Sequence, residues 1–161
     1  MIKLFFLLFS TISLNAQIKL MRMEDSCTFE YIGNIIDTLR VFYPLGGNKL
    51  LPMDFYVNIS DDKKTRVVLT LIRFDLLKDD FESAIEGLHI EVEERDDNLK
   101  IGNRNFRFVS GTKVEKGLNM EYLVFASNSI DKVLVFSYNL DDWNDNFDLH
   151  FYKVLSTYKC R

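Results

Sequence analysis

Three strand-like segments in the second half of the chain are joined by links that are too short for a crossover. The segments are residues 104–111, 118–126 and 132–139, and polar links centred on Lys116 and Asn128 connect them. Antiparallel neighbours can be joined by a two-residue turn, whereas a parallel crossover needs a dozen or more residues. The spacing therefore predicts an antiparallel meander, and this constrains the fold more than any other feature of the sequence.

An earlier pair of segments predicts a hairpin. Residues 53–60 alternate between apolar and polar side chains, as in a strand with one buried face. After a polar turn, residues 65–74 are β-branched and apolar on both faces, which predicts a central strand covered on two sides. A shorter strand is expected at residues 38–43, because Pro44 favours an extended conformation at the residue before it.

A helix is expected between the hairpin and the meander. It should begin at Asp79 or Asp80, where acidic residues have the spacing of a capping box, and end near Gly87. Residues 89–93 alternate again and are interpreted as a strand, although an extension of the helix stays open. Residues 95–98 are rich in turn formers and predict a turn.

A second helix is predicted over residues 142–159, where apolar side chains recur with helical spacing. The predicted fold class is therefore α+β, with an antiparallel sheet packed by two helices. The predicted core collects the apolar faces of these elements: Phe55, Val57, Ile59, Val67, Leu69, Leu71, Phe81, Ile85, Leu88, Phe106, Phe108, Val124, Val133, Val135, Phe147, Phe151, Val154 and Leu155.

The first sixteen residues have the pattern of a removable secretory signal. Lys3 is followed by an apolar run over residues 4–14, and Ala16 is the small residue at the expected cleavage point. The run is about half of the ~20 residues that cross a bilayer. We therefore expect a signal peptide at residues 1–16, a single soluble domain at residues 17–161 without a membrane span, and a periplasmic or secreted location.

Cys27 and Cys160 are the two cysteines of the chain. In an oxidising compartment an even pair predicts a disulfide, here one that ties together the two ends of the mature chain. Two unrelated thiols remain the alternative, because only geometry decides whether the pair can be bridged. A zinc site is not predicted, since no other cysteine or histidine has ligand spacing.

The charge balance bears on the kind of partner. The chain has 20 Lys and Arg against 24 Asp and Glu. A mildly acidic protein without clustered basic residues is a poor match for nucleic acid. The expected partner is therefore another protein of the envelope or of the secreted compartment.

No segment has a catalytic, metal or cofactor motif, so none of these sites is predicted. Residues 142–148 resemble a calcium loop, but Phe147 stands where the loop needs Gly and Lys153 where it needs Glu. The loop of Gly46, Gly47 and Asn48 is a candidate partner-contact loop, because loops on a rigid sheet often carry binding functions.

The order of elements resembles the PsbP-like fold family. The resemblance covers residues 38–159 and depends on the Val-Phe-Tyr-Pro segment at residues 41–44, and on Trp143 at the start of a C-terminal helix that ends at residues 154–158. The family includes extrinsic photosystem II proteins, a nuclear-import Ran-binding factor and secreted bacterial proteins. It implies an α/β/α sandwich that acts by binding. A tryptophan commonly follows the Tyr-Pro pair in the family but is missing at residues 45–47, and no functional residue carries over.

Two functions are therefore compared. The first is an exported, non-catalytic binding or accessory protein of the cell envelope, for example an immunity or inhibitor protein. The alternative is a small periplasmic hydrolase whose site brings His89 or His150 together with carboxylates such as Asp79 or Glu91. A pocket that holds both a histidine and a carboxylate within hydrogen-bond reach would favour the enzyme.

Overall fold

The computed structural model describes residues 18–22, 27–44, 50–59, 66–73, 80–130, 132–142 and 146–159. Strands make up 66% of these residues and helices 20%. The predicted α+β class, with a sheet packed by two helices, is therefore wrong, and the fold is β-rich. The reason is that strands continue through segments with turn-like or helix-like composition, while the two helices are short.

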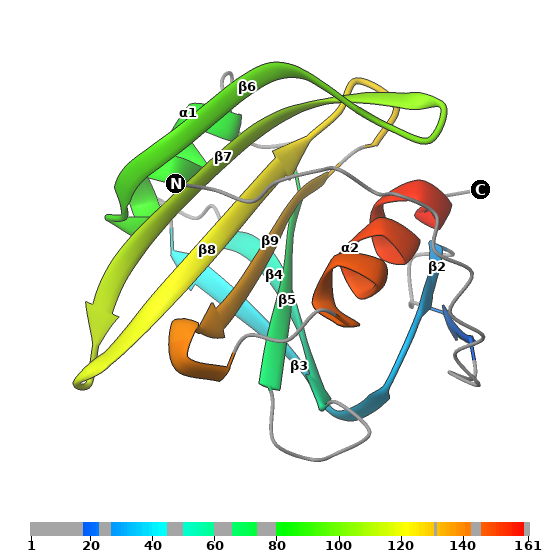
Figure 1. Cartoon of the computed structure of the whole chain (residues 1–161), viewed down its shortest axis with the longest axis horizontal. Helices are drawn as coiled ribbons and strands as arrows, with labels where there is room; N and C mark the ends of the chain where they lie inside the picture. Colours follow the sequence, from blue (N-terminus) through cyan, green and yellow to red (C-terminus); the bar gives the residue numbers. More distant parts are fainter. Residues whose placement is uncertain are drawn as a thin grey trace.

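The elements follow one another in an order dominated by strands (Figure 1). They are β1 (Lys19–Arg22), β2 (Thr28–Tyr31), β3 (Asn34–Pro44), β4 (Leu50–Ile59), β5 (Arg66–Arg73), α1 (Asp80–Leu88), β6 (Glu91–Ile101), β7 (Arg104–Glu115), β8 (Leu118–Ala126), β9 (Lys132–Asn139), the 3-10 helix η1 (Leu140–Asp142) and α2 (Asn146–Thr157).

Seven of the described strands form one antiparallel sheet in the order β3-β4-β5-β9-β8-β7-β6. The predicted β4–β5 hairpin and the predicted meander of β7, β8 and β9 are both confirmed. The contact between β5 and β9 joins the two halves of the sheet, so β5 is an interior strand, as expected. β1 and β2 form a separate two-stranded ribbon.

The turn between β7 and β8 shows why the meander is so tightly connected. Lys116 and Gly117 both have positive φ angles, 50° and 83°, while Glu115 and Leu118 on either side are paired. Two central residues with positive φ match the twist of the flanking strands, which is why this geometry is favoured in short hairpins.

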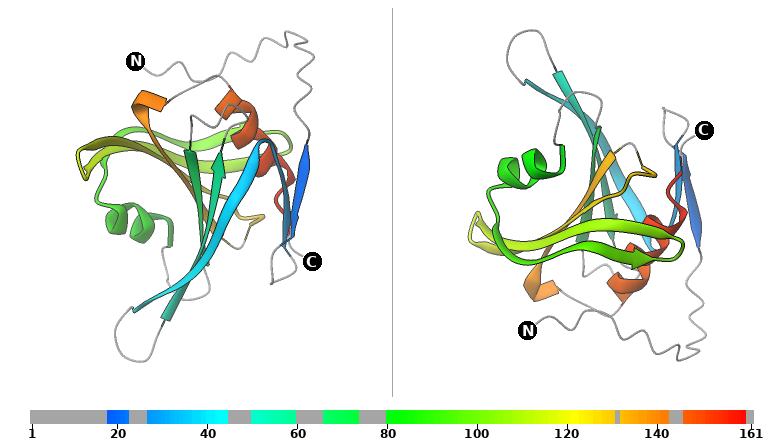
Figure 2. Two further views of the ribbon diagram at one scale, coloured as in Figure 1. Left: turned by 90° about the horizontal axis from the view of Figure 1, so that it is seen from below. Right: turned by 90° about the horizontal axis from the view of Figure 1, so that it is seen from above.

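Each face of the sheet has its own hydrophobic core. Phe81 and Ala84 of α1 pack on one face, against residues such as Val124 and Val133. On the other face, α2 and β2 contribute the second core (Figure 2). Phe151 of α2 lies there with its ring 4.6 Å from that of Phe136 on β9.

Most of the predicted core is confirmed, because both faces of the sheet are covered in the centre. The buried members are Val67, Leu69, Leu71, Phe81, Phe106, Phe108, Val124, Val133, Val135, Phe151, Val154 and Leu155. Phe55, Val57, Ile85 and Leu88 are only partly buried. The side chains of Ile59 and Phe147 lie outside the described part.

The orientation of β4 corrects the predicted core. Tyr56 and Asp54 are the buried residues there, whereas Phe55 between them is half-exposed. Tyr56 packs edge-on against Phe29 of β2, with ring centres 5.6 Å apart. Asp54 is paired with Arg40 of β3 through a bond of 2.5 Å to Nε. A tyrosine and a paired aspartate thus occupy the side that the alternation pattern assigned to polar, exposed residues.

The segment after α1 is partly as predicted. α1 ends at Leu88, close to Gly87, and His89 follows in a left-handed conformation with a φ of 52°. Residues 91–93 lie in a strand, as interpreted. The predicted turn at residues 95–98 is wrong, because β6 runs through it with a register shift between Asp96 and Leu99.

The final helix is shorter than predicted. α2 spans residues 146–157, η1 occupies residues 140–142, and Trp143 lies outside the described residues. Neither α-helix of the described ranges has the length and apolar character that crossing a bilayer would require.

Candidate functional site

A polar cleft of about 780 Å³ lies at one end of the sheet. The ends of β6 and β7 with their turn, and the β8–β9 connection, form its walls. Amide and hydroxyl side chains are the commonest kind in the lining, beside the apolar residues Phe81, Phe106, Ala126 and Ile130. The amide and hydroxyl residues are Asn98, Asn103, Asn105, Ser127, Asn128 and Ser129. The charged side chains in the lining are Asp97, Arg104 and Arg107.

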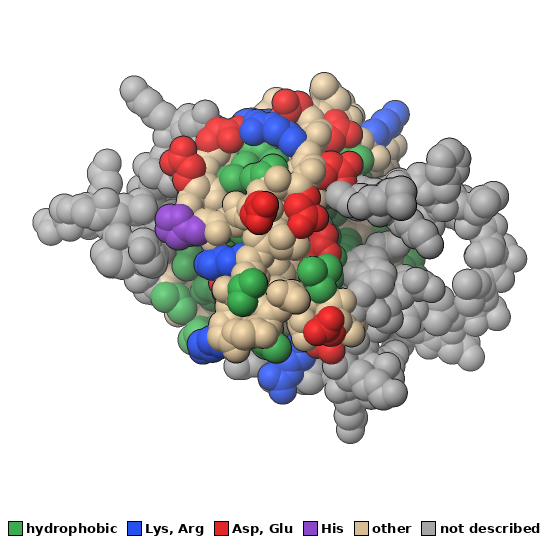
Figure 3. All heavy atoms as spheres, turned by 60° about the vertical axis from the view of Figure 1, so that its left-hand side comes forward, with side chains coloured by type: hydrophobic (Ala, Val, Ile, Leu, Met, Phe, Trp, Pro, Cys, Tyr) green, Lys and Arg blue, Asp and Glu red, His purple; other side chains and the backbone are tan. Residues whose placement is uncertain are grey.

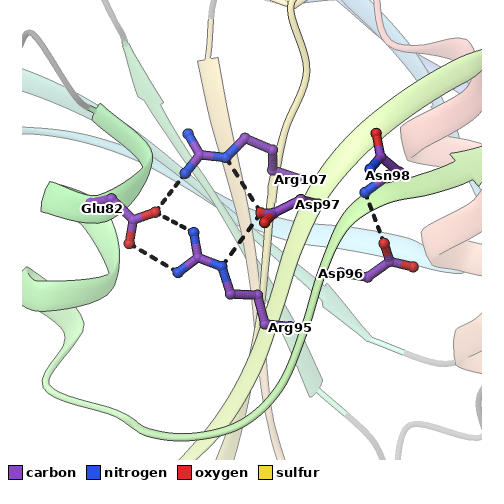
Figure 4. Close-up of polar contacts among 6 residues, drawn as sticks. All are labelled: Glu82, Arg95, Asp96, Asp97, Asn98 and Arg107. Carbon is purple, nitrogen blue, oxygen red and sulfur yellow. Dashed lines mark hydrogen bonds and ion pairs between the residues drawn. The ribbon is translucent and has the colours of Figure 1, made fainter.

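An ion-pair cluster borders the cleft and connects α1 to the sheet (Figure 4). Glu82 of α1 accepts hydrogen bonds from Nη2 of Arg95 on β6 and from Nη2 of Arg107 on β7, each at 2.5 Å. Asp97 lies between the two arginines, with its Oδ1 at 3.4 Å from Nε of Arg95 and 3.7 Å from Nε of Arg107. The hydrogen bond from Arg95 holds the pKa of Glu82 below its usual value.

The guanidinium of Arg107 is also held by an aromatic ring. Its Cζ lies 4.4 Å from the ring centre of Phe81, which is itself buried. A cation stacked on a ring face gains electrostatic attraction as well as packing. Three side chains, Glu82, Asp97 and Phe81, therefore contact Arg107, and the two carboxylates neutralise its charge.

Arg104 is different, because its guanidinium forms no ion pair within 4 Å with any carboxylate of the described residues. Its Nη1 donates one hydrogen bond, 3.1 Å long, to the backbone carbonyl of Leu155 in α2. A guanidinium has five N–H donors. Arg104 therefore has N–H donors left for other partners, and it is one of the residues that line the cleft.

β6 forms an acidic edge to the sheet, next to the cleft. Its exposed residues include Glu91, Glu93, Asp96 and Asp97, and acidic side chains gather on this side of the molecule in Figure 3. Among the described residues, no strand pairs with the free edge of β6. Val92 is 50% exposed within this acidic edge.

A further carboxylate lies on β8 near the same edge. Burial raises the pKa of Glu121, and the hydroxyl of Tyr138 donates to its Oε2 at 2.5 Å. Glu93 of β6 adds to this effect through its negative charge, while its own Oε1 accepts a bond from Thr112. These groups extend the negative potential from the edge onto the sheet.

The two histidines are not brought together. His150 is 5% exposed and packs edge-on against Phe136, and burial lowers its pKa to about 4. His89 is exposed on the turn after α1. Neither lines the cleft. Of the carboxylates considered for catalysis, Glu91 is exposed at the start of β6, and Asp79 lies outside the described residues.

Several predicted features cannot be placed. The loop of Gly46, Gly47 and Asn48 lies outside the described residues, as does the signal segment. In the described ranges, no group of three acidic, histidine or cysteine side chains is arranged to hold a metal ion.

The predicted disulfide stays a prediction, since Cys160 lies outside the described residues. Cys27 is buried, and Nζ of Lys132 lies 3.8 Å from its Sγ. Thr28 and Lys159 exchange backbone hydrogen bonds of 2.8 and 2.9 Å in an antiparallel bridge. The neighbours of both cysteines in the sequence are therefore paired, which supports the predicted bond.

Sequence reasoning missed the cleft residues. Asn103, Arg104 and Asn105 form one polar run, and residues 127–129 form another. The sequence pattern predicts only a strand that begins at residue 104 and a connection at residues 127–129. The signal that could have indicated a polar cleft was the gathering of amides at the ends of strands, because such positions lie at the end of a sheet.

In comparisons with models of known families, with curated proteins and with solved structures, no match to the chain was found. The resemblance to the PsbP-like family therefore stays an untested expectation.

Proposed function

We propose that the mature chain is an exported, non-catalytic binding protein whose β6 edge docks an extended, basic segment of a partner protein. The observation that carries this proposal is the long, exposed and acidic edge strand. An unpaired edge presents N–H and C=O groups that can form a ladder with another strand. An immunity or inhibitor protein that neutralises a basic effector in the same compartment is one form of this role.

The charges on β6 select the partner. Negative side chains along the edge repel a second copy of the same strand, and thereby oppose self-association. They attract a basic segment, which raises the rate of association and suppresses acidic competitors. Val92 adds an apolar contact within the acidic edge.

The positions of the histidines support binding over hydrolysis. His150 is packed among aromatic rings with its pKa lowered, so it is neutral and shielded near pH 7. His89 is exposed on a turn, outside the cleft. Neither histidine therefore lines the cleft, whereas the hydrolase alternative needs a histidine and a carboxylate in one pocket.

Charge-neutralising variants test the docking edge. Glu91→Gln with Glu93→Gln removes two charges from β6, and Glu86→Gln with Asp141→Asn removes two exposed charges from α1 and η1. A partner captured from an envelope extract by wild-type protein is purified and its affinity measured by calorimetry. We expect the edge variant to bind at least about tenfold more weakly, or ~1.4 kcal/mol, and the control to bind like wild type.

Two outcomes would contradict the proposal. Equal losses in both double variants would mean that net charge alone attracts the partner. The recovery of no partner, together with turnover of a substrate that His150→Gln abolishes in a folded protein, would favour the hydrolase.

A further inference from the structure

We infer that the cleft beside the ion-pair cluster binds a small monoanion rich in hydroxyl groups, in chemical class a sugar acid, with Arg104 as the carboxylate ligand. This inference is independent of the proposed docking edge, because it depends on different side chains at the end of the sheet.

The size and lining of the cleft set the class of ligand. Its volume of about 780 Å³ falls within the range of small-molecule sites. Asn103, Asn105 and Asn128 each offer a carbonyl acceptor and an NH₂ donor, and Ser127 and Ser129 offer hydroxyls. A polyol has hydroxyls that donate and accept in the same way, and its C–H groups can pack on the apolar lining residues Phe81 and Phe106. A wholly apolar ligand would leave the amides and hydroxyls unsatisfied.

The charges in the cleft set the charge of the ligand. Asp97 lies close to Arg107, whose guanidinium also donates to Glu82. Arg104 then remains as the cation without a carboxylate partner among the described residues. One such guanidinium matches one carboxylate, which it can bind with two parallel hydrogen bonds. A dianion would lack a second cation and would be repelled by Asp97.

The arginine is already held in place. Its bond to the carbonyl of Leu155 anchors one side of the guanidinium to α2. At the wall of the cleft, Phe81 and Glu82 hold Arg107. Part of the cost of ordering Arg104 is therefore met before a ligand binds, which lowers the entropic cost of association.

Titrations of the purified protein with three probes, followed by amide chemical shifts, test the inference. The probes are glucuronate, which has the hydroxyls and the carboxylate, glucose, which lacks the carboxylate, and acetate, which lacks the hydroxyls. We expect saturable shifts around Gly102 and Ser127 with glucuronate, and binding at least about tenfold weaker with either of the other probes.

Variants then assign the carboxylate contact. Arg104→Gln should weaken glucuronate binding at least about tenfold. Because this change also alters the bond to Leu155, Asn103→Asp serves as a second variant that adds a negative charge and leaves that bond in place. It should weaken glucuronate binding more than glucose binding, because the added negative charge repels only the ligand that has a carboxylate. Arg66→Gln is the control, since exposed Arg66 lies at the end of β5 that is remote from the cleft.

Three results would overturn the inference. One is the absence of saturable shifts at the cleft with glucuronate. Another is glucose binding as tight as glucuronate binding. The third is Arg104→Gln and Asn103→Asp proteins that both bind glucuronate like the wild type and the Arg66→Gln control.

Discussion

Arg107 lies over the ring of Phe81, with its Cζ 4.4 Å from the ring centre. The ring belongs to α1 and the guanidinium to β7, so this pair joins the helix to the sheet. Glu82, the next residue of α1, accepts a hydrogen bond from the same guanidinium. The side chain that borders the cleft is therefore held by two neighbouring residues of one helix.

Glu82→Gln should weaken this junction. Because the Glu82 side chain is 36% exposed, solvent screening limits the loss to about 0.5–1 kcal/mol of unfolding free energy at pH 7. The pKa of Glu82 is lowered in the folded state, so its contribution is present above its unfolded value near 4.5. It is lost as the pH falls through the lower, folded value.

Urea unfolding of wild type and variant at neutral and acidic pH measures this difference. Glu86→Gln, an exposed change one turn further along α1, is the matched control and should cost little. A difference that persists unchanged after Glu82 is protonated would contradict the ionic origin of the effect.

His150 should make the fold sensitive to acid. Burial lowers its pKa from 6.5 to about 4, so the unfolded chain takes up the proton before the folded one does. The stability due to neutral His150 is complete above about pH 6.5 and declines as the pH falls toward 4. The loss is on the order of 3 kcal/mol.

His150→Phe should remove this part of the pH dependence, even though it leaves the backbone carbonyl of Ile32 without its histidine partner. Unfolding free energies measured between about pH 7 and 4 test the slope rather than the absolute stability. His89→Asn is the control, since Asn tolerates the left-handed backbone there. An unchanged slope in His150→Phe would show that other groups cause the acid sensitivity.

Gly111 allows β6 to approach β7. A Cβ at this position would lie 2.5 Å from the backbone oxygen of Glu91 and 3.0 Å from Cδ1 of Ile90. Gly111→Ala should therefore cost about 1–3 kcal/mol and increase hydrogen exchange at the start of β6. Gly87→Ala is the contrast, because a Cβ there meets nothing within 4 Å in α1. It should stabilise the protein by about 0.5–1 kcal/mol. Equal effects in both variants, measured by thermal unfolding, would contradict this account.

The antiparallel register that pairs Thr28 with Lys159 predicts Cys27 and Cys160 as the next pair along the two segments. Neighbouring pairs in such a ladder have Cα separations within the disulfide range. We expect a bonded peptide pair in non-reducing mass spectrometry, and a stability loss of up to about 5 kcal/mol on reduction. Two thiols that alkylate freely in denaturant without reductant would contradict the bond.

Intact mass of the exported protein also tests the predicted signal. A chain that begins at Gln17 is expected after cleavage behind Ala16. Retention of the first sixteen residues on exported protein would contradict removal of the signal.

Local patterns predicted the β4–β5 hairpin, α1 and the β7–β8–β9 meander. Each depends on residues that are close in sequence, such as the turn at Lys116 and Gly117, so the information lies within the segment. The turn predicted at residues 95–98 was wrong because it also depended on local composition alone. Pairing of β6 with β7 overrides local propensity there, and the excess residues are accommodated by an irregular register.

Contacts between distant segments decided how the two halves of the sheet join, which side of β4 is buried and how the cleft residues are held. The pairing of β5 with β9, the burial of Tyr56 against Phe29, and the bond from Arg104 to Leu155 each join residues that are far apart in the chain. Periodicity shows which residues share a face of a strand, but it does not show what will cover that face. The sequence alone therefore determined where the hairpin and the meander form. The tertiary structure decided which charges are neutralised, and among the described residues it left Arg104 in the cleft lining without an ion-pair partner.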